Sequence, residues 1–165
     1  MSMTFTTADL CDEMGDGVRV AEPVFRDYGG VRSFSGEIDT LRIFEDNALV
    51  RPTLETPGRG RVLVIDGGGS VRTALLGGQL AALAAENGWS GVVINGAVRD
   101  VPELRDAKIG IKALAAAPRR SAKQGKGARG VPVTFAGIEF RPGDRLWGDE
   151  DGLLVADGAR SDRVS

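Results

Sequence analysis

The sequence contains no histidine among its 165 residues. Catalytic pairs of serine or cysteine with histidine, imidazole bases and zinc sites with histidine ligands are therefore excluded. Proton transfer must rely on carboxylates, lysine, tyrosine or water. A bound metal must have mainly oxygen ligands, and this requirement favours Mg²⁺ or Mn²⁺.

Cysteine is almost absent as well, because Cys11 is the one cysteine of the sequence. A disulfide within the chain is impossible, which agrees with a reducing compartment. Cys11 has no basic neighbour, so we interpret it as a small buried residue rather than a nucleophile. The sequence has no apolar run near the roughly 18 residues that cross a bilayer, and no signal peptide pattern. We therefore expect a cytoplasmic protein without a membrane segment.

The sequence has no excess of positive charge, since its net charge is -2 and its pI about 5.3. This balance does not favour direct binding of nucleic acid. The basic segment 119–130 is a local exception, but it has no aromatic residue for base stacking, so we interpret it as a solvated loop or a subunit contact. We interpret the acidic segment 147–152 as a charged turn, and Trp89 and Trp147 as packing residues.

The length and the 42% of hydrophobic residues predict one domain over residues 1–165. The clearest pattern is an apolar strand with a glycine loop at 61–69, a helix at 77–88 and a second apolar strand at 90–96. Strand, helix and strand within about 35 residues form a βαβ unit with parallel strands. Other helices are expected at 6–14 (capped by Thr6 or Thr7), 46–55 (interrupted by Pro52) and 101–107, and strands at 33–44, 109–116, 131–144 (a hairpin) and 151–157. The pattern predicts an α/β domain with a mixed sheet.

Glycine-rich and charged segments follow both strands of this unit, DGGGS at 66–70 and GAVRD at 96–100. The carboxyl ends of parallel strands meet at one edge of a sheet, where ligands bind. We therefore expect Arg99 and Asp100 as exposed side chains on a binding rim. The glycine spacing fits neither a dinucleotide-binding fingerprint nor a P-loop.

Gly77 and Gly78 are adjacent glycines, which would cost about 2 kcal/mol relative to alanine inside a helix. We therefore expect them to begin a helix. The backbone N–H groups of Gly78, Gln79 and Leu80 would then form an anion site at the positive end of the helix dipole. The alternative is that the glycines only allow close packing of the crossover.

Together these features favour a site for a 2-oxo acid. A helix N-terminus and the forked guanidinium of Arg99 can grip one carboxylate from two sides, and Asp100 can hold a divalent cation. Such a cation acts as a Lewis acid and stabilises an enolate. The alternative is that Arg99 and Asp100 form only a surface ion pair that caps the helix at Pro102.

The run from Arg61 to Leu104 resembles the RraA-like members of the class II aldolase group, and so do FRDYGG and FEDNALV before it and IGIKALAAAPRRS, PGD and DGLLV after it. The resemblance covers almost the whole chain. Its most specific motif is a glycine, twenty residues, Arg-Asp, two residues and an acid, here Gly78, Arg99, Asp100 and Glu103. The resemblance implies a homotrimer with a swivelling-type α/β core and sites near subunit boundaries.

The resemblance implies two activities. One is metal-dependent cleavage of 4-hydroxy-4-methyl-2-oxoglutarate to pyruvate, with oxaloacetate decarboxylation through the same enolate. The other is inhibition of RNA processing by binding to ribonuclease E. For the lyase, it implies Arg99 and Asp100 as catalytic residues and Asp100 as the ligand of Mg²⁺ or Mn²⁺. The implied substrate-binding residues are Gly77, Gly78, Gln79, Leu80 and Arg99.

The sequence departs from the family pattern in two ways, of which one argues against the lyase activity and the other for it. Aldolases of the group often carry aspartate where Gly78 stands, so the group that orients the proton-transferring water is not identified. Regulators can lack the acid after the arginine, whereas Asp100 is present, so metal binding is expected. We expect a metal-dependent lyase, with the ribonuclease E regulator as the alternative.

Overall fold

The computed structural model describes residues 4–158. Its helices are α1 (Thr7–Met14), α2 (Val50–Glu55), α3 (Gly78–Glu86) and α4 (Val101–Asp106), with a 3₁₀ turn, η1, at Gly15–Gly17. Its strands are β1 (Arg19–Val20), β2 (Arg26–Asp27), β3 (Phe34–Arg42), β4 (Val62–Asp66), β5 (Ala74–Leu76), β6 (Gly91–Val98), β7 (Gly110–Ala116), β8 (Ala128–Arg129), β9 (Val133–Phe135), β10 (Ile138–Phe140), β11 (Arg145–Asp149) and β12 (Gly152–Ala156).

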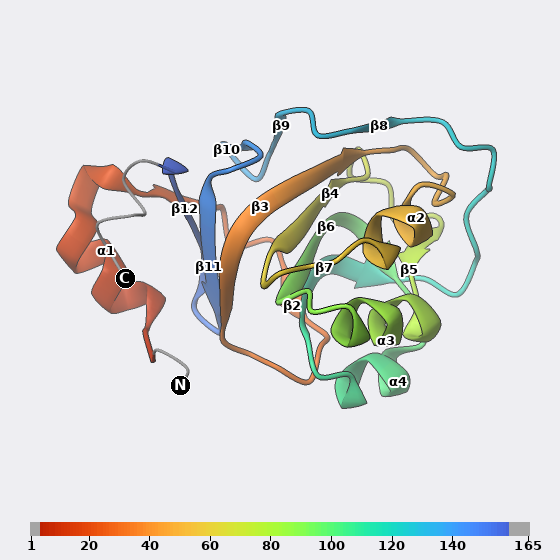
Figure 1. Cartoon of the computed structure of the whole chain (residues 1–165), viewed down its shortest axis with the longest axis horizontal. Coiled ribbons are helices and arrows are strands. Elements are labelled where there is room, and N and C mark those ends of the chain that lie inside the picture. Colours follow the sequence, from red (N-terminus) through yellow and green to blue (C-terminus); the bar gives the residue numbers. More distant parts are fainter. Residues whose placement is uncertain (1–3, 159–165) are drawn as a thin grey trace.

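A mixed sheet forms the centre of the molecule (Figure 1). Its strands lie in the order β1-β12-β11-β3-β4-β6-β7-β2, and β3, β4, β6 and β7 are parallel neighbours. The antiparallel strands β11, β12 and β1 extend it beyond β3, and β2 pairs with β7. The predicted βαβ unit is β4, α3 and β6, so the predicted α/β domain with a mixed sheet is confirmed.

The parallel strands are buried on both faces, which explains their continuous apolar sequences. One face packs against α2, α3 and α4, which Figure 1 shows gathered on one side of the sheet. The other face packs against the hairpin β9–β10, where the rings of Phe135 and Phe140 stack with centroids 4.4 Å apart. A smaller core holds α1 against β11 and β12. Trp89 and Trp147 are 3% and 4% exposed, which confirms them as packing residues.

Three local expectations were wrong in part. The helix predicted at 46–55 begins only at Val50 and continues through Pro52, because a proline in the first turn removes an N–H that has no partner in the helix. The acidic segment 147–152 contains the expected charged turn at Glu150 and Asp151, but its other residues belong to β11, which extends to Asp149, and to β12, which begins at Gly152. Cys11 is half-buried rather than buried. None of the helices within residues 4–158 is long and apolar enough to cross a membrane.

Candidate active site

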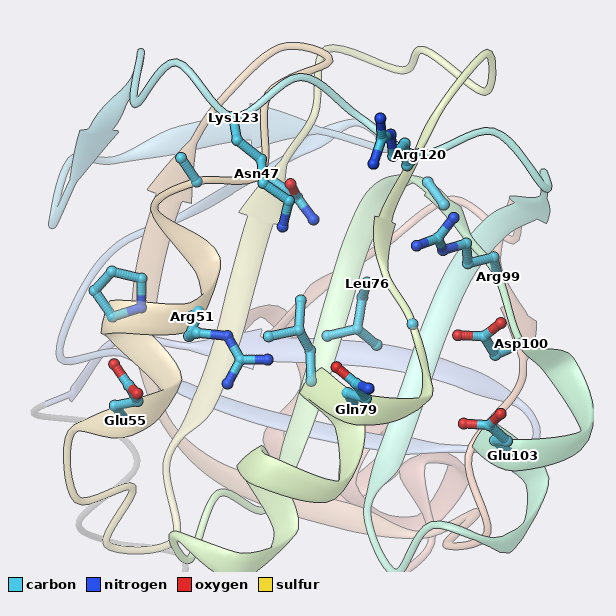
Figure 2. A pocket seen from close by; sticks show the side chains of 15 residues that line it. Asn47, Arg51, Glu55, Leu76, Gln79, Arg99, Asp100, Glu103, Arg120 and Lys123 are labelled. Carbon is cyan, nitrogen blue, oxygen red and sulfur yellow. The ribbon is translucent and has the colours of Figure 1, made fainter.

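A cavity of about 510 Å³ lies at the carboxyl ends of β6 and β7 (Figure 2). One wall comes from the start of α3 and the turn between β6 and α4. The opposite wall comes from α2, and the loop after β7 runs from beside Arg99 toward the α2 side of the cavity. The cavity is lined by Asn47, Ala48, Arg51, Pro52, Glu55, Ala74, Leu76, Gly77, Gln79, Leu80, Arg99, Asp100, Glu103, Arg120 and Lys123. The residues selected from the sequence therefore lie in one cavity, with Gly78 beside it in the first turn of α3.

Asp100 is held in an unusual backbone conformation that directs its carboxylate at α3. Its φ of 63° and ψ of 45° lie in the left-handed region, which aspartate enters more readily than most residues. The Asp100 Oδ2 atom accepts a hydrogen bond of 2.9 Å from the Gly78 N–H. A Cβ at position 77 would lie 2.6 Å from the same oxygen, so a glycine at position 77 makes room for this contact.

This contact corrects one expectation about the helix N-terminus. Gly77 and Gly78 do begin α3, as predicted, with Gly77 as the N-cap. The Gly78 N–H, however, is occupied by Asp100 and is not free to bind substrate. The first-turn amides of Gln79 and Leu80, whose N–H groups have no partner within the helix, remain at the cavity.

Arg99 lies beside Asp100 without forming an ion pair with it. Its backbone N–H donates to Leu76 O at 3.0 Å, and its Nη1 donates to Pro118 O at 3.4 Å. Within residues 4–158 no carboxylate lies within salt-bridge distance of Arg99, and the Asp100 side chain does not cap α4. The alternative of a capping surface ion pair is therefore wrong. Asp100 is exposed as expected, whereas Arg99 is half-buried and lines the cavity.

Glu103 occupies the space beside Gly78. A Cβ built at position 78 would collide with the Glu103 carboxylate and would lie 2.9 Å from its Cβ. Gly78 and Glu103 of the sequence motif are therefore linked sterically, because the Glu103 side chain occupies the space that the missing side chain of Gly78 leaves. Asp100 and Glu103 both carry exposed carboxylates and stand three residues apart at the start of α4.

The opposite wall was not identified from the sequence. Arg51 and Glu55 stand one turn apart on α2, and Arg120 and Lys123 come from the basic segment 119–130. The interpretation of that segment as a solvated loop or subunit contact was incomplete, since two of its cations line the cavity. Four cationic and three acidic side chains line the cavity altogether, which suits an anionic ligand that also binds a cation.

Asp46 holds the basic loop in place. Its side chain is 4% exposed and accepts backbone N–H bonds from Ala48 at 3.1 Å, Gln124 at 3.0 Å, Gly125 at 3.3 Å and Lys126 at 3.2 Å. Burial raises the pKa of Asp46, but these four hydrogen bonds outweigh burial, so the pKa lies below its usual value.

Replacing Asp46 with asparagine is expected to lower the free energy of unfolding by about 2 kcal/mol, because amide N–H groups then lose a charged acceptor. A carboxyl whose folded pKa is lowered stabilises the fold above its unfolded pKa, and this stability is lost as the pH falls through the folded pKa. Urea unfolding near neutral pH and in acid measures both effects. Equal stability of the two proteins at neutral pH would contradict this role.

Comparison with known proteins identifies the family. The family model described as RraA-like, Aldolase/RraA, matches residues 7–155. This chain belongs to the RraA-like family. A relative from Burkholderia mallei (strain SAVP1), named "Putative 4-hydroxy-4-methyl-2-oxoglutarate aldolase", is 54% identical over 162 residues, covering 95% of this chain and 98% of that protein.

Solved structures of the family confirm the fold. The RNA-processing inhibitor RraA from Thermus thermophilis is 54% identical to this RraA-like chain, with a TM-score of 0.90 and coverage of 93% of each chain. A structure from Geobacillus kaustophilus HTA426, named S-adenosylmethionine: 2-dimethylmenaquinone methyltransferase, is 49% identical, with a TM-score of 0.91 and coverage of 93% and 95%. Relatives of similar identity carry three different functional names, so the chemistry of the cavity must guide the choice among them.

Proposed function

We propose that this RraA-like protein is a divalent-metal-dependent lyase that releases pyruvate from 2-oxo acids. Its aldol substrate is 4-hydroxy-4-methyl-2-oxoglutarate, and oxaloacetate is decarboxylated through the same enolate. The observation that carries the proposal is the meeting of Arg99, two carboxylates and the start of α3 in one cavity. The name of the Burkholderia relative supports the aldolase assignment.

The donor set of the cavity fits Mg²⁺ or Mn²⁺. Asp100 and Glu103 offer exposed carboxylate oxygens, and one oxygen of Asp100 remains beyond its bond to Gly78. Residues 4–158 contain no cluster of three or more metal-ligating side chains. Two carboxylates are nevertheless sufficient for Mg²⁺, which keeps several waters and takes further oxygens from its substrate. Such a cation, when bound, supplies Lewis-acid stabilisation of the enolate.

The protein groups bind and orient the substrate. Arg99 takes the carboxylate next to the keto group in a bidentate pair, and the amides of Gln79 and Leu80 face the same anion. Asp100 and Glu103 hold the cation. The Glu103 carboxylate also fills the space into which a side chain at position 78 would extend. Glu103 is therefore our candidate for orienting the water that transfers the proton.

Cleavage of the aldol substrate breaks the bond between C3 and C4. The C4 hydroxyl loses its proton as the carbonyl of the first pyruvate forms. The bond electrons move into the enolate of the second pyruvate, which takes up a proton at C3. Oxaloacetate gives the same enolate when carbon dioxide leaves, so one site serves both substrates.

Oxalate tests this proposal because it imitates the planar pyruvate enolate, and analogues of high-energy intermediates bind tightly. Calorimetry is expected to show oxalate binding in the presence of Mn²⁺, with much weaker binding after a chelator removes the metal. Oxalate affinity that does not depend on Mn²⁺ would contradict the proposed chelate.

Replacing Arg99 with lysine keeps the charge but removes the bidentate fork. We expect KM for oxaloacetate to rise about tenfold, since one charge-assisted hydrogen bond is lost. Mn²⁺ affinity should stay unchanged. Steady-state kinetics and a Mn²⁺ titration measure the two quantities, and an unchanged KM would remove Arg99 from the substrate site.

Inhibition of ribonuclease E is the second candidate function, favoured by the similarity to the Thermus RNA-processing inhibitor. That function needs an outer protein surface rather than the cavity. Variants of Arg99 or Asp100 should then inhibit ribonuclease E as well as the wild type does.

We also propose a homotrimer with sites near its subunit boundaries. Light scattering is expected to give three times the 17.3 kDa mass of the chain. Phe44 and Val71, which are 56% and 45% exposed, are candidates for the contact, because burial of apolar side chains stabilises an assembly. A stable monomer at micromolar concentration would contradict the trimer.

A further inference from the structure

A second cavity, of about 580 Å³, lies at the opposite ends of the parallel strands. It is formed by the first half of β3 and the segments that lead into β4 and β6, and Arg145, the first residue of β11, lies opposite Glu37 of β3. Its side chains come from Ser35, Glu37, Arg59, Arg61, Ser90 and Arg145, none of which lines the candidate active site. We propose that this cavity binds a tetrahedral oxyanion, a phosphate or sulfate group of a small ligand.

Arg61 is held rigidly in this cavity. Its guanidinium donates to Gly58 O at 3.0 Å and Pro57 O at 2.9 Å, pairs with Asp39 at 3.4 Å and lies 4.7 Å from the ring centre of Trp89. These contacts remove most of the conformational freedom of the side chain, so an anion need not order it on binding.

Arg59 and Arg145 supply the positive charge of the cavity, which Glu37 opposes, the residue across from Arg145 in the pairing of β3 with β11. Arg145 donates to Ser35 Oγ at 3.4 Å and lies 5.8 Å from the ring centre of Trp147. Arg59 stands in the left-handed region with φ of 55°. Within residues 4–158, no carboxylate lies within 4 Å of the nitrogens of either guanidinium.

The backbone under the arginines is also fixed. Gly60 donates its N–H to Gly88 O at 2.8 Å, and Ser90 donates to Arg61 O at 2.8 Å. A Cβ at Gly36 would collide with the Gly60 carbonyl, so only glycine allows β3 and this turn to approach so closely. The turn that carries Arg59 and Arg61 is therefore locked against β3 and the start of β6.

The charge and the directions of the arginine side chains in this cavity indicate which kind of anion it binds. Arg59 and Arg145 outnumber the one carboxylate that lines the cavity, Glu37, while Asp39 pairs with Arg61, so the cavity keeps a net positive charge. The three guanidiniums reach the cavity from two separate segments. The Ser35 hydroxyl adds a polar contact, whereas the Ser90 hydroxyl already donates to Ser35 O at 2.8 Å. Donors that converge from several directions suit the oxygens of a tetrahedral anion better than the two coplanar oxygens of a carboxylate.

Tryptophan fluorescence gives a direct readout, because the two tryptophans of the sequence each lie beside an arginine of this cavity. Titration with inorganic phosphate or with sulfate, at constant ionic strength, is expected to give a saturable fluorescence change. Calorimetry on the same samples measures the affinity independently.

Substitutions then locate the site. Arg59→Gln and Arg145→Gln are each expected to raise Kd about tenfold, because each removes a charge-assisted contact. Glu37→Gln should lower Kd about threefold, since it removes a repelling charge. Arg51→Gln, a matched change in the other cavity, should leave the fluorescence titration unchanged.

Three results would overturn the proposal. The first is the absence of saturable binding by both fluorescence and calorimetry at millimolar anion. The second is binding to the wild type that Arg59→Gln and Arg145→Gln leave unchanged. The third combines two observations: the wild type binds no anion, and light scattering gives the two variants a smaller mass than the wild type. That result would assign the arginines to a subunit contact.

Discussion

Replacing Asp100 with alanine is expected to lower metal-dependent pyruvate release at least about 10³-fold, from both oxaloacetate and 4-hydroxy-4-methyl-2-oxoglutarate. Lewis-acid stabilisation of an enolate amounts to several kcal/mol, and each 1.36 kcal/mol corresponds to about tenfold in rate. The same change removes the acceptor of the Gly78 N–H. A coupled pyruvate assay and a Mn²⁺ titration measure both losses.

Asp106→Ala is the matched control, because Asp106 is an exposed aspartate at the other end of α4 and does not line the cavity. It should retain full activity. Circular dichroism should show both variants folded, since Asp100 is exposed and contributes no side chain to the core. A rate for Asp100→Ala within tenfold of the wild type would contradict the role of this carboxylate.

Replacing Phe34 with alanine is expected to lower the free energy of unfolding by about 3–5 kcal/mol, the usual cost of removing a buried aromatic ring. Phe34 is 4% exposed, and its ring lies against the backbone of Gly91 in β6, Gly110 in β7 and Gly148 in β11. Val24→Ala, at a side chain 48% exposed, is the control and should change stability by less than about 0.5 kcal/mol. Urea unfolding measures both.

A double-mutant cycle tests the glycine contacts directly. A Cβ at Gly110 would collide with the Phe34 ring, so Gly110→Ala should cost about 1–3 kcal/mol in the wild type and clearly less in the Phe34→Ala background. Additive effects would mean that the ring and the glycine do not interact.

The sequence predicted one wall of the candidate site, whose residues all come from the βαβ unit and the turn that follows it. The βαβ pattern brought the start of α3 next to the turn after β6, because both features follow from parallel strands joined by one helix. Gly77 and Gly78 then marked the helix start, and Arg99 and Asp100 marked the rim. The Gly78 N–H could not be assigned to Asp100 in advance, since that bond depends on the left-handed conformation of Asp100.

The opposite wall could not be predicted because it depends on tertiary packing. Arg51 and Glu55 stand four residues apart, a spacing that aligns them on one helix face but does not say what that face meets. The basic loop reaches the cavity only because Asp46, nearly eighty residues earlier, binds its backbone. Phe34 likewise looked like an ordinary strand residue, and its three glycine contacts come from strands far apart in the sequence.

The most direct test is pyruvate release by the purified wild-type protein from 4-hydroxy-4-methyl-2-oxoglutarate and oxaloacetate, with added Mg²⁺ or Mn²⁺ and after chelation. The proposed lyase predicts turnover of both substrates with metal, loss of turnover after chelation and recovery when the metal is restored. A protein that releases no pyruvate with any divalent metal, yet slows ribonuclease E at stoichiometric concentration, would contradict the lyase and establish the regulator.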